Sequence, residues 1–248
     1  MPINAIRQED VFNTDRFNPG ESNGVNIVCA TNTLGINRPS PSVANQIGKR
    51  FHNDFLNLGA AQLGHLHYRA GQLSEGVSAR FYAIVTNEVK PGTRPGDNDH
   101  DWQFAPLSIA EGLNNLSVDG IIRPTPQQIH EIKRTGLIDL NEITDSPGYD
   151  PIRVNSKIDQ AWKAMEEIRA RINPIVRIVL IGTGASGTLN HADTAGILES
   201  MHASDLNLVL YLKQAQVAHV AEVINLYPKL RHQVPVVNEV DRLQLLAA

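Results

Sequence analysis

The sequence predicts an α/β domain built on a largely parallel β-sheet, with a long insertion in its middle. Short apolar runs typical of buried strands alternate with segments whose apolar residues recur at helical spacing. One such run, residues 176–181, leads directly into a glycine-rich loop that is followed by another predicted helix. This alternation of strands and helices is typical of α/β domains.

The first part of the chain contains three predicted strands and one helix. Residues 5–12 (AIRQEDVF) read as a strand running into a loop, and residues 25–30 (VNIVCA) and 80–86 (RFYAIVT) read as buried strands. Between them, residues 43–58 predict an amphipathic helix. Its apolar side chains, at helical spacing, are Val43, Ala44, Ile47, Phe51, Phe55 and Leu58.

Residues 88–155 break this rhythm with a high density of proline and charged turns. The prolines are Pro91, Pro95, Pro106, Pro124, Pro126, Pro147 and Pro151. Proline interrupts helices and central strands, so we interpret the stretch as a long insertion or lid rather than a second domain. Two short helices are expected inside it, at 105–116 and 125–134.

The rest of the chain returns to strands and helices. Ser156 is expected to cap a helix, because the apolar residues that follow it share one helical face. Those residues are Ile158, Ala161, Trp162, Met165 and Ile168. The strands expected next are 176–181, 206–212 and 234–237, and the helices are 193–201 and 217–226. Residues from about 213 to 248 are interpreted as a carboxy-terminal extension of the single domain.

Composition excludes several classes of protein. The 248 residues are 42% hydrophobic, which is enough for a sizeable core. The net charge is −4 and no long lysine or arginine run occurs, so nonspecific nucleic-acid binding is not expected. The single cysteine, Cys29, excludes a disulfide framework. We expect no signal peptide, membrane span, metal or cofactor, and a cytoplasmic protein of a reducing compartment.

The glycine loop is the strongest functional signal. An apolar, β-branched run ends in Gly182, Gly184 and Gly187, spaced G-x-G-x-x-G, before a predicted helix. Glycine permits close approach of the backbone to a ligand, and exposed N–H groups at a helix start favour a phosphate. We therefore expect a nucleotide or its diphosphate there, although a tight strand–helix turn without a ligand has the same pattern.

One interpretation of this loop is the dinucleotide-binding fingerprint of a Rossmann-type NAD(P) oxidoreductase. That fingerprint belongs to the first strand of a sheet, whereas this loop comes late in the chain. The next strand should end in an acidic residue for the ribose, but here it is followed by Lys213 and Gln214. A lysine suits only a 2′-phosphate.

Motifs elsewhere indicate a different family. Glu9-Asp10-Val11 stands in the turn after the first strand, and residues 32–35 (Asn-Thr-Leu-Gly) follow the second. The next helix matches an A-x-x-[FI]-x-K-x-[FY] pattern at Ala44, Ile47, Lys49 and Phe51. Together with the glycine loop and the strand at 206–212, this order resembles a macrodomain, nearest the terminal ADP-ribose and DNA ADP-ribosyl glycohydrolase branches. The resemblance implies a three-layer fold, a mixed sheet flanked by helices.

The resemblance also implies a ligand, either ADP-ribose, an NAD-derived relative, or an ADP-ribosylated protein or nucleic acid. In macrodomains the acid of the first turn accepts a hydrogen bond from adenine, a role that falls to Asp10 beside Val11. The asparagine loop holds the proximal ribose, which implicates Asn32, Thr33 and Gly35. The diphosphate would be wrapped by Gly182, Thr183, Gly184, Ala185, Ser186 and Gly187, with Arg38 in reach of a phosphate. An ordinary turn or capping role is the alternative for Asp10 and for Asn32.

The catalytic residues of the related hydrolases are not matched. Asn87 stands where they carry a lysine, and Ser186 or Gly187 where they carry an aspartate. The candidate catalytic residues left in this chain lie in the insertion: Lys90, Asp97, Asp99, His100 and Asp101. The expected role is therefore a reader, a sequestering protein or a divergent hydrolase. The other open classes are the oxidoreductase and an interaction module that has lost its ligand.

Two histidines form a second, weaker candidate. His65 and His67 lie two residues apart in an extended segment, a geometry that can ligate a metal. No third ligand is near in sequence, so ordinary exposed or hydrogen-bonded histidines are the favoured interpretation. His191 and His202 stand as single candidates.

Overall fold

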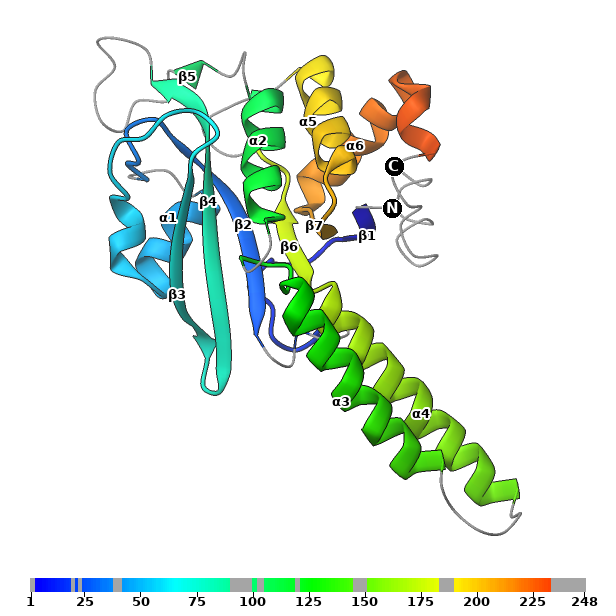
Figure 1. Cartoon of the computed structure of the whole chain (residues 1–248). Coiled ribbons are helices and arrows are strands. Elements are labelled where there is room, and N and C mark those ends of the chain that lie inside the picture. Colours follow the sequence, from blue (N-terminus) through cyan, green and yellow to red (C-terminus); the bar gives the residue numbers. More distant parts are fainter. Residues whose placement is uncertain are drawn as a thin grey trace.

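The computed structural model describes residues 3–18, 21, 24–37, 42–89, 100–101, 105–118, 121–144, 151–182 and 190–232. Its centre is a mixed β-sheet with helices on both faces, and a pair of long helices projects from one end (Figure 1). The α/β class and the mixed sheet between helical layers are thereby confirmed.

The described strands are β1 (Ile3–Arg7), β2 (Val25–Asn32), β3 (Leu66–Ser74), β4 (Val77–Val89), β5 (His100–Asp101), β6 (Ile175–Val179) and β7 (Asn207–Tyr211). Their order across the sheet is β1-β7-β6-β2-β4-β3, and β5 pairs with β4 off this path. Neighbours from β1 to β4 are parallel, whereas β3 and β5 run antiparallel to β4. The carboxyl ends of five strands therefore lie along one edge.

Strand alternation separates the core into two layers. In β2, Ile27 and Cys29 face the layer of α1 (Val43–Arg50) and of the 3₁₀ turn η2 (Asn53–Leu56), whereas Val28 faces the opposite layer. The opposite layer contains α2 (Ala105–Leu116), α5 (His191–Ala203) and α6 (Gln214–Leu226). Each face of the sheet thus has its own apolar cover.

The helix expected over 43–58 is shorter than the apolar spacing suggested. Ser42 caps its start by accepting a hydrogen bond from the backbone N–H of Asn45. The helix ends at Arg50, where the N–H groups of Phe51 and His52 both donate to the carbonyl of Ile47. The chain then turns into η2, which still buries Phe55 completely. The apolar pattern therefore predicted the burial of Phe55 correctly, although the helix itself ends at Arg50.

The stretch interpreted as an insertion divides into two parts. Helix α2 belongs to the core, because Ile109, Leu113 and Leu116 are fully buried and Gly112 lies against Ile84 of β4. The projecting part consists of α3 (Pro126–Thr144) and α4 (Pro151–Ile172), which pack against each other with Gly136 beside Ile168 (Figure 1). The helix expected from Ser156 begins at Pro151, a residue suited to a first helical position.

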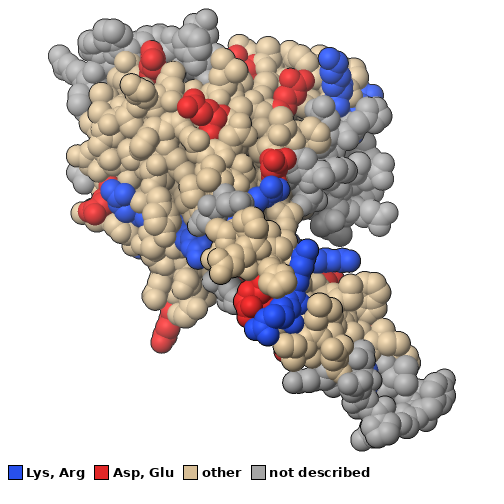
Figure 2. Space-filling model, viewed as in Figure 1, with Lys and Arg blue, Asp and Glu red and all other residues tan. Residues whose placement is uncertain are grey.

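The segment after β7 is also part of the core. Val220 and Val223 of α6, with Leu230 of the 3₁₀ turn η3 (Pro228–His232), are buried against the layer of α2 and α5. The strand expected at 234–237 lies outside the described residues. Among the described helices, none combines the length and apolarity needed to cross a bilayer. On the face in view, acidic and basic side chains are interspersed (Figure 2).

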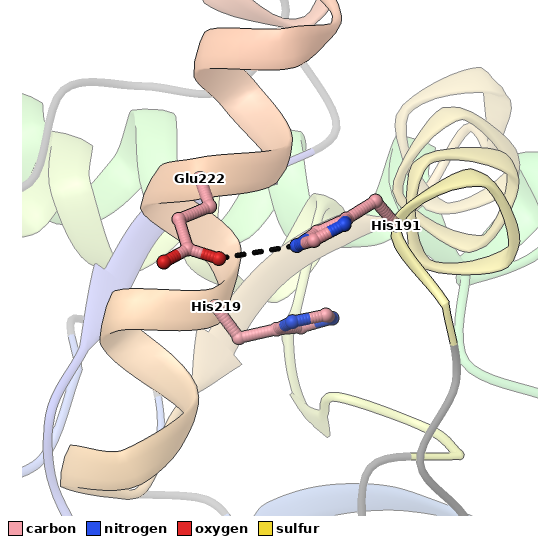
Figure 3. Close-up of side chains that lie close together, drawn as sticks. All are labelled: His191, His219 and Glu222. Carbon is pink, nitrogen blue, oxygen red and sulfur yellow. Dashed lines mark hydrogen bonds and ion pairs between the residues drawn. The ribbon is translucent and has the colours of Figure 1, made fainter.

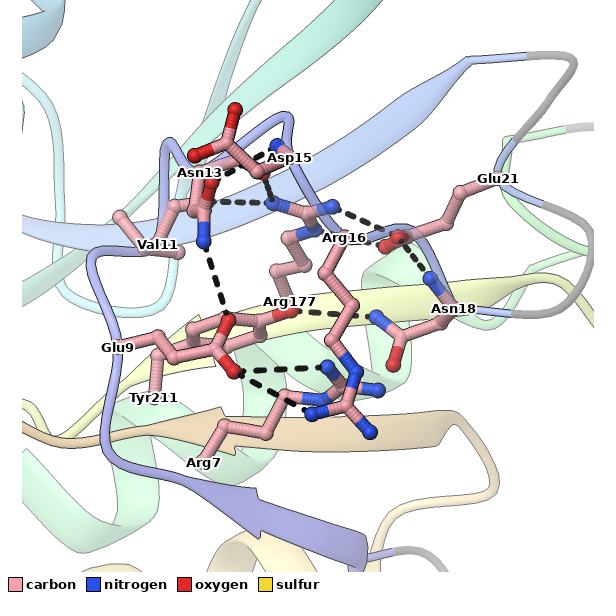
Figure 4. A network of polar contacts seen from close by, with 10 residues as sticks. All are labelled: Arg7, Glu9, Val11, Asn13, Asp15, Arg16, Asn18, Glu21, Arg177 and Tyr211. Atoms are coloured by element: carbon pink, nitrogen blue, oxygen red, sulfur yellow. Dashed lines mark hydrogen bonds and ion pairs between the residues drawn. The ribbon is translucent and has the colours of Figure 1, made fainter.

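A buried ion pair fastens the loop after β1 to the sheet. Arg177 of β6 is fully buried, and its guanidinium donates to both carboxylate oxygens of Glu21 at 2.8 and 2.7 Å. It also donates to the carbonyls of Val11 and Asn13 at 2.9 and 2.7 Å (Figure 4). Burial acts to lower the pKa of Arg177, but the hydrogen bonds and charge of Glu21 raise it overall. One cation therefore holds Val11, Asn13 and Glu21 against β6.

Further polar side chains complete this network. The amide of Asn18 donates to the hydroxyl of Tyr211 at 3.2 Å, and the Tyr211 ring lies 5.3 Å from the guanidinium carbon of Arg177. Glu21 accepts from the backbone N–H of Asn18 at 2.7 Å. The loop after β1 is thus connected to both β6 and β7 (Figure 4).

We predict that Glu21→Gln destabilises the protein strongly, because it leaves the buried charge of Arg177 without a counterion. The free energy of unfolding, measured by urea denaturation, should fall by about 3–5 kcal/mol. The matched control is Glu131→Gln, which breaks an exposed pair with Arg134 on α3 and should leave the midpoint almost unchanged. Equal effects of the two variants would contradict this role of Arg177.

Candidate functional site

The sheet has a topological switch point between β2 and β6. These strands are parallel neighbours, with Ile27 opposite Arg177 and Val28 opposite Ile178. The chain leaves β2 through α1 on one face toward β4, and leaves β6 through α5 on the other face toward β7. In open α/β sheets, ligands bind in the crevice outside the carboxyl ends of strands at such a point.

The loop after β2 is built by one asparagine side chain. The carbonyl oxygen of Asn32 accepts from the backbone N–H groups of Leu34 and Ile36, at 3.0 and 3.3 Å. Its amide nitrogen donates to the carbonyl of Ile36 at 2.9 Å. Asn32, predicted as a ribose contact, therefore has a turn-forming role in the structure.

Gly35 is required by both conformation and space. Its φ of 65° lies in the left-handed region. A Cβ there would stand 2.2 Å from the carbonyl oxygen of Gly59, because the segment after η2 crosses the loop closely. The crossing is held by hydrogen bonds from Leu58 to Gly35 and from Ala61 to Thr33, both 2.9 Å. The predicted close approach at Gly35 is to the protein's own backbone.

The end of β4 lies beside this loop. The N–H of Thr33 donates to the carbonyl of Asn87 at 3.0 Å, and the Thr33 hydroxyl accepts from the N–H of Val89 at 3.3 Å. The pairing of β2 with β4 shifts in register between Thr31 and Asn32. Thr86 is the extra residue of β4 at this point and has no partner residue in β2. Asn87 is buried, and its side-chain oxygen accepts from the Thr86 hydroxyl at 3.3 Å.

Strand β5 brings two candidate catalytic positions to the same place. His100 pairs with Val89, and Asp101 pairs with Glu88 at the end of β4. The backbone of both residues is therefore beside the end of β4, which also contacts Thr33. Lys90, Asp97 and Asp99 lie outside the described residues.

The turn after β1 contains Asp10 and Val11. Val11 is buried in the layer of α1, whereas Asp10 is exposed. One carboxylate oxygen of Asp10 accepts from the N–H of Phe12 at 3.1 Å, and the other lies 3.8 Å from a guanidinium nitrogen of Arg50. Asp10 thus shapes its own turn and still presents a carboxylate to solvent.

The glycine loop begins where the sequence places it. Gly182 follows β6 with a φ of 83°, in the left-handed region, directly after the buried Leu180 and Ile181. Asn190 then caps α5 by accepting from the N–H of Asp193 at 2.8 Å. Thr183 to Gly187, with Ser186 among them, and Arg38 lie outside the described residues.

A separate cavity of about 450 Å³ lies between residues 60–67 and α2, where Glu111 and Asn115 line it. His67 also lines this cavity; it is buried, and its Nε2 has no hydrogen-bond partner among the described residues. Burial, with smaller contributions from His65 and Arg69, lowers the pKa of His67 to about 4. Among the described residues, no third metal-ligating side chain joins His65 and His67, whose ring centres are 4.7 Å apart.

No family model matches the chain, and no curated protein matches it. Solved structures similar to it include the macrodomain of Thermus aquaticus DarG. The sequence identity is 13%, the match covers 84% of this chain and 97% of that chain, and the TM-score is 0.40.

We predict that Gly35→Ala disrupts the loop after β2. The substitution adds a backbone clash with Gly59 to the strain of a positive φ, and the hydrogen bonds from Leu58 to Gly35 and from Ala61 to Thr33 hold the two segments together. The control Gly76→Ala has a similar φ of 75° but open space around its Cβ, so it should cost only about 1 kcal/mol. The free energy of unfolding of Gly35→Ala, measured by urea denaturation, should fall by about 2 kcal/mol more than that of Gly76→Ala. Equal losses would contradict the close crossing.

We predict a loss of stability in mild acid that depends on His67. The unfolded chain protonates this histidine near pH 6.5 and the folded protein only near pH 4, so the folded state is penalised as pH falls between them. The unfolding free energy should fall by up to about 3 kcal/mol across that window. His67→Leu should remove this slope, while His130→Gln on the exposed face of α3 should keep it. An unchanged slope in His67→Leu would contradict the assignment.

Proposed function

We propose that the protein binds ADP-ribose, or an ADP-ribose-containing relative, at the carboxyl edge of the sheet where β2 and β6 end. The observation that carries the proposal is the switch point. The loop with Asn32, Thr33 and Gly35 follows β2 and the glycine loop follows β6, the two strands that flank it, whereas Asp10 follows β1 at the same edge of the sheet. The motif resemblance to macrodomains supplies the identity of the ligand.

Different loops along this edge suit the adenine, the ribose and the diphosphate of the ligand. The exposed carboxylate of Asp10, after β1, is a suitable acceptor for the amino group of adenine. The ribose would lie against the loop after β2, which Asn32 and Gly35 hold rigid. The diphosphate would meet the backbone after Gly182 and the amino end of α5.

Order in the first of these loops comes from the buried pair of Arg177 and Glu21. Because Arg177 stands in β6 and binds the carbonyl of Val11, the adenine and diphosphate regions are tied to one strand. Preorganised loops lose little conformational entropy on binding, which favours affinity. A rigid crevice is what a reader or a sequestering protein needs.

Catalysis by the residues of the related hydrolases is not part of the proposal. Asn87, at the position of their lysine, is a buried amide that accepts from Thr86 and has no titratable proton. A turnover reaction would need an acid or base from elsewhere, and β5 places the backbone of His100 and Asp101 beside the end of β4. We therefore propose slow or absent release of ADP-ribose from modified macromolecules.

We predict that calorimetry with the full chain finds tighter binding of ADP-ribose than of NAD or NADPH. Asp10→Asn keeps an acceptor for the turn but removes the charge, and should weaken ADP-ribose binding about tenfold or more. Asp15→Asn, an exposed aspartate of the same loop, is the matched control and should bind like the parent protein. Tight NADPH binding without a response to ADP-ribose would favour the oxidoreductase. No binding of any of the three would favour an interaction module.

A further inference from the structure

Two histidines and a glutamate meet between α5 and α6, away from the loops after β1 and β2. His191 is the first residue of α5, and His219 and Glu222 lie three residues apart on α6, hence on one helical face. One ligand atom from each lies within 4.8 Å of the other two. Figure 3 shows the His191 ring pointing to Glu222, with the His219 ring beneath it.

The contacts of the three residues leave suitable atoms facing one another. Nε2 of His191 lies 3.1 Å from a carboxylate oxygen of Glu222. Nε2 of His219 lies 2.8 Å from the hydroxyl of Thr194, a buried residue of α5. When the Nε2–H of His219 donates to the Thr194 hydroxyl, Nδ1 of His219 is the nitrogen with a free lone pair. A hydrogen bond from the second ring nitrogen is the usual support of a metal-bound histidine.

The spacing is close to that of a tetrahedral metal site. With metal–ligand bonds of about 2.0 Å, neighbouring ligand atoms lie roughly 3.3 Å apart. The pair of His191 and Glu222, at 3.1 Å, already meets this spacing. The imidazoles are stacked, with centres 5.1 Å apart and planes 20° from parallel, so metal binding requires the His219 ring to tilt toward the other two ligands while its Nε2 stays hydrogen-bonded to Thr194. His191 and Glu222 are partly exposed, which leaves room for that movement and for a water ligand.

We propose that His191, His219 and Glu222 bind one divalent transition-metal ion of the Zn²⁺ class. Two imidazoles and one carboxylate suit Zn²⁺ and its neighbours, whereas Mg²⁺ and Ca²⁺ prefer oxygen donors throughout. Three protein ligands leave a fourth position for water. The ion would fasten the first turn of α5, which follows the glycine loop, to α6.

The contact between His191 and Glu222 also forms in an ordinary ion pair that needs no metal. The stability of an ion pair between His191 and Glu222 would not depend on His219 or on the hydroxyl of Thr194. A metal site depends on both, because one is a ligand and the other orients that ligand. Metal affinity of variants at these two positions therefore separates the explanations.

The test uses the full chain stripped with a chelator and then titrated with Zn²⁺ alone, followed by calorimetry and thermal unfolding. Zn²⁺ should bind at one site per chain and raise the unfolding midpoint. His191→Gln, His219→Gln and Glu222→Gln should each weaken binding at least tenfold. Thr194→Val, which keeps the shape of the side chain, should weaken it roughly 10–100-fold. His130→Gln on α3 is the matched control and should bind like the parent.

Replacement of Zn²⁺ by Co²⁺ provides a second readout, because the visible absorption of Co²⁺ reports imidazole ligation in four-coordinate geometry. The spectrum should be lost in the double variant His191→Gln/His219→Gln. The proposal is overturned if that double variant binds Zn²⁺ as tightly as the parent, or if Thr194→Val and His219→Gln leave the affinity unchanged.

Discussion

The buried guanidinium of Arg177 is the constraint on which the placement of the loop after β1 depends. A charge with no exposure to water must be neutralised and hydrogen-bonded, and no single neighbour in β6 can do both. The chain meets this requirement by bringing Glu21 and the carbonyls of Val11 and Asn13 onto it. The loop after β1 is thereby fixed relative to β6, although their sequence separation exceeds 150 residues.

Among the loops that the structure describes at this edge, Arg177 donates hydrogen bonds to the loop after β1, and the others have local supports of their own. Asn32 satisfies its loop with side-chain hydrogen bonds, and Gly35 lets the segment at Gly59 cross it. The end of β4 is attached through Thr33. Each loop is rigid for a separate reason, and the parallel strands align their ends. The alignment of these loops along one edge is the common result of sheet topology and these local hydrogen bonds.

The spacing of apolar residues along the chain and the amino-acid composition were sufficient to predict most of the fold. Buried runs such as residues 25–30 and the strand–helix alternation after 156 correspond to described elements. Strand β3 was missed, because its exposed positions alternate with glycine and polar side chains rather than with strong β-formers. Helix α2 was assigned to an insertion because prolines surround it, yet its face of Ile109, Leu113 and Leu116 completes the core.

The candidate site was predictable only where local sequence determines local structure. The turns at Asn32 and Gly35 follow from residue type. The ion pair of Arg177, and the meeting of His191 with His219 and Glu222, depend on contacts between distant elements, which no spacing along the chain reveals. Arg177 stands in an apolar run and was interpreted only as part of a strand. An arginine inside such a run is the signal that predicts a buried acidic partner.

Binding of ADP-ribose at the carboxyl edge of the sheet is tested most directly by mapping amide chemical shifts in the ¹⁵N-labelled full chain as ADP-ribose is added. We expect the largest shifts on Val11, Thr33, Gly35 and Gly182, at the carboxyl ends of β1, β2 and β6. Residues at the opposite edge of the sheet, such as Gly24 and Gly76, should not respond. Largest shifts at that opposite edge, or around the cavity at His67, would place the ligand elsewhere.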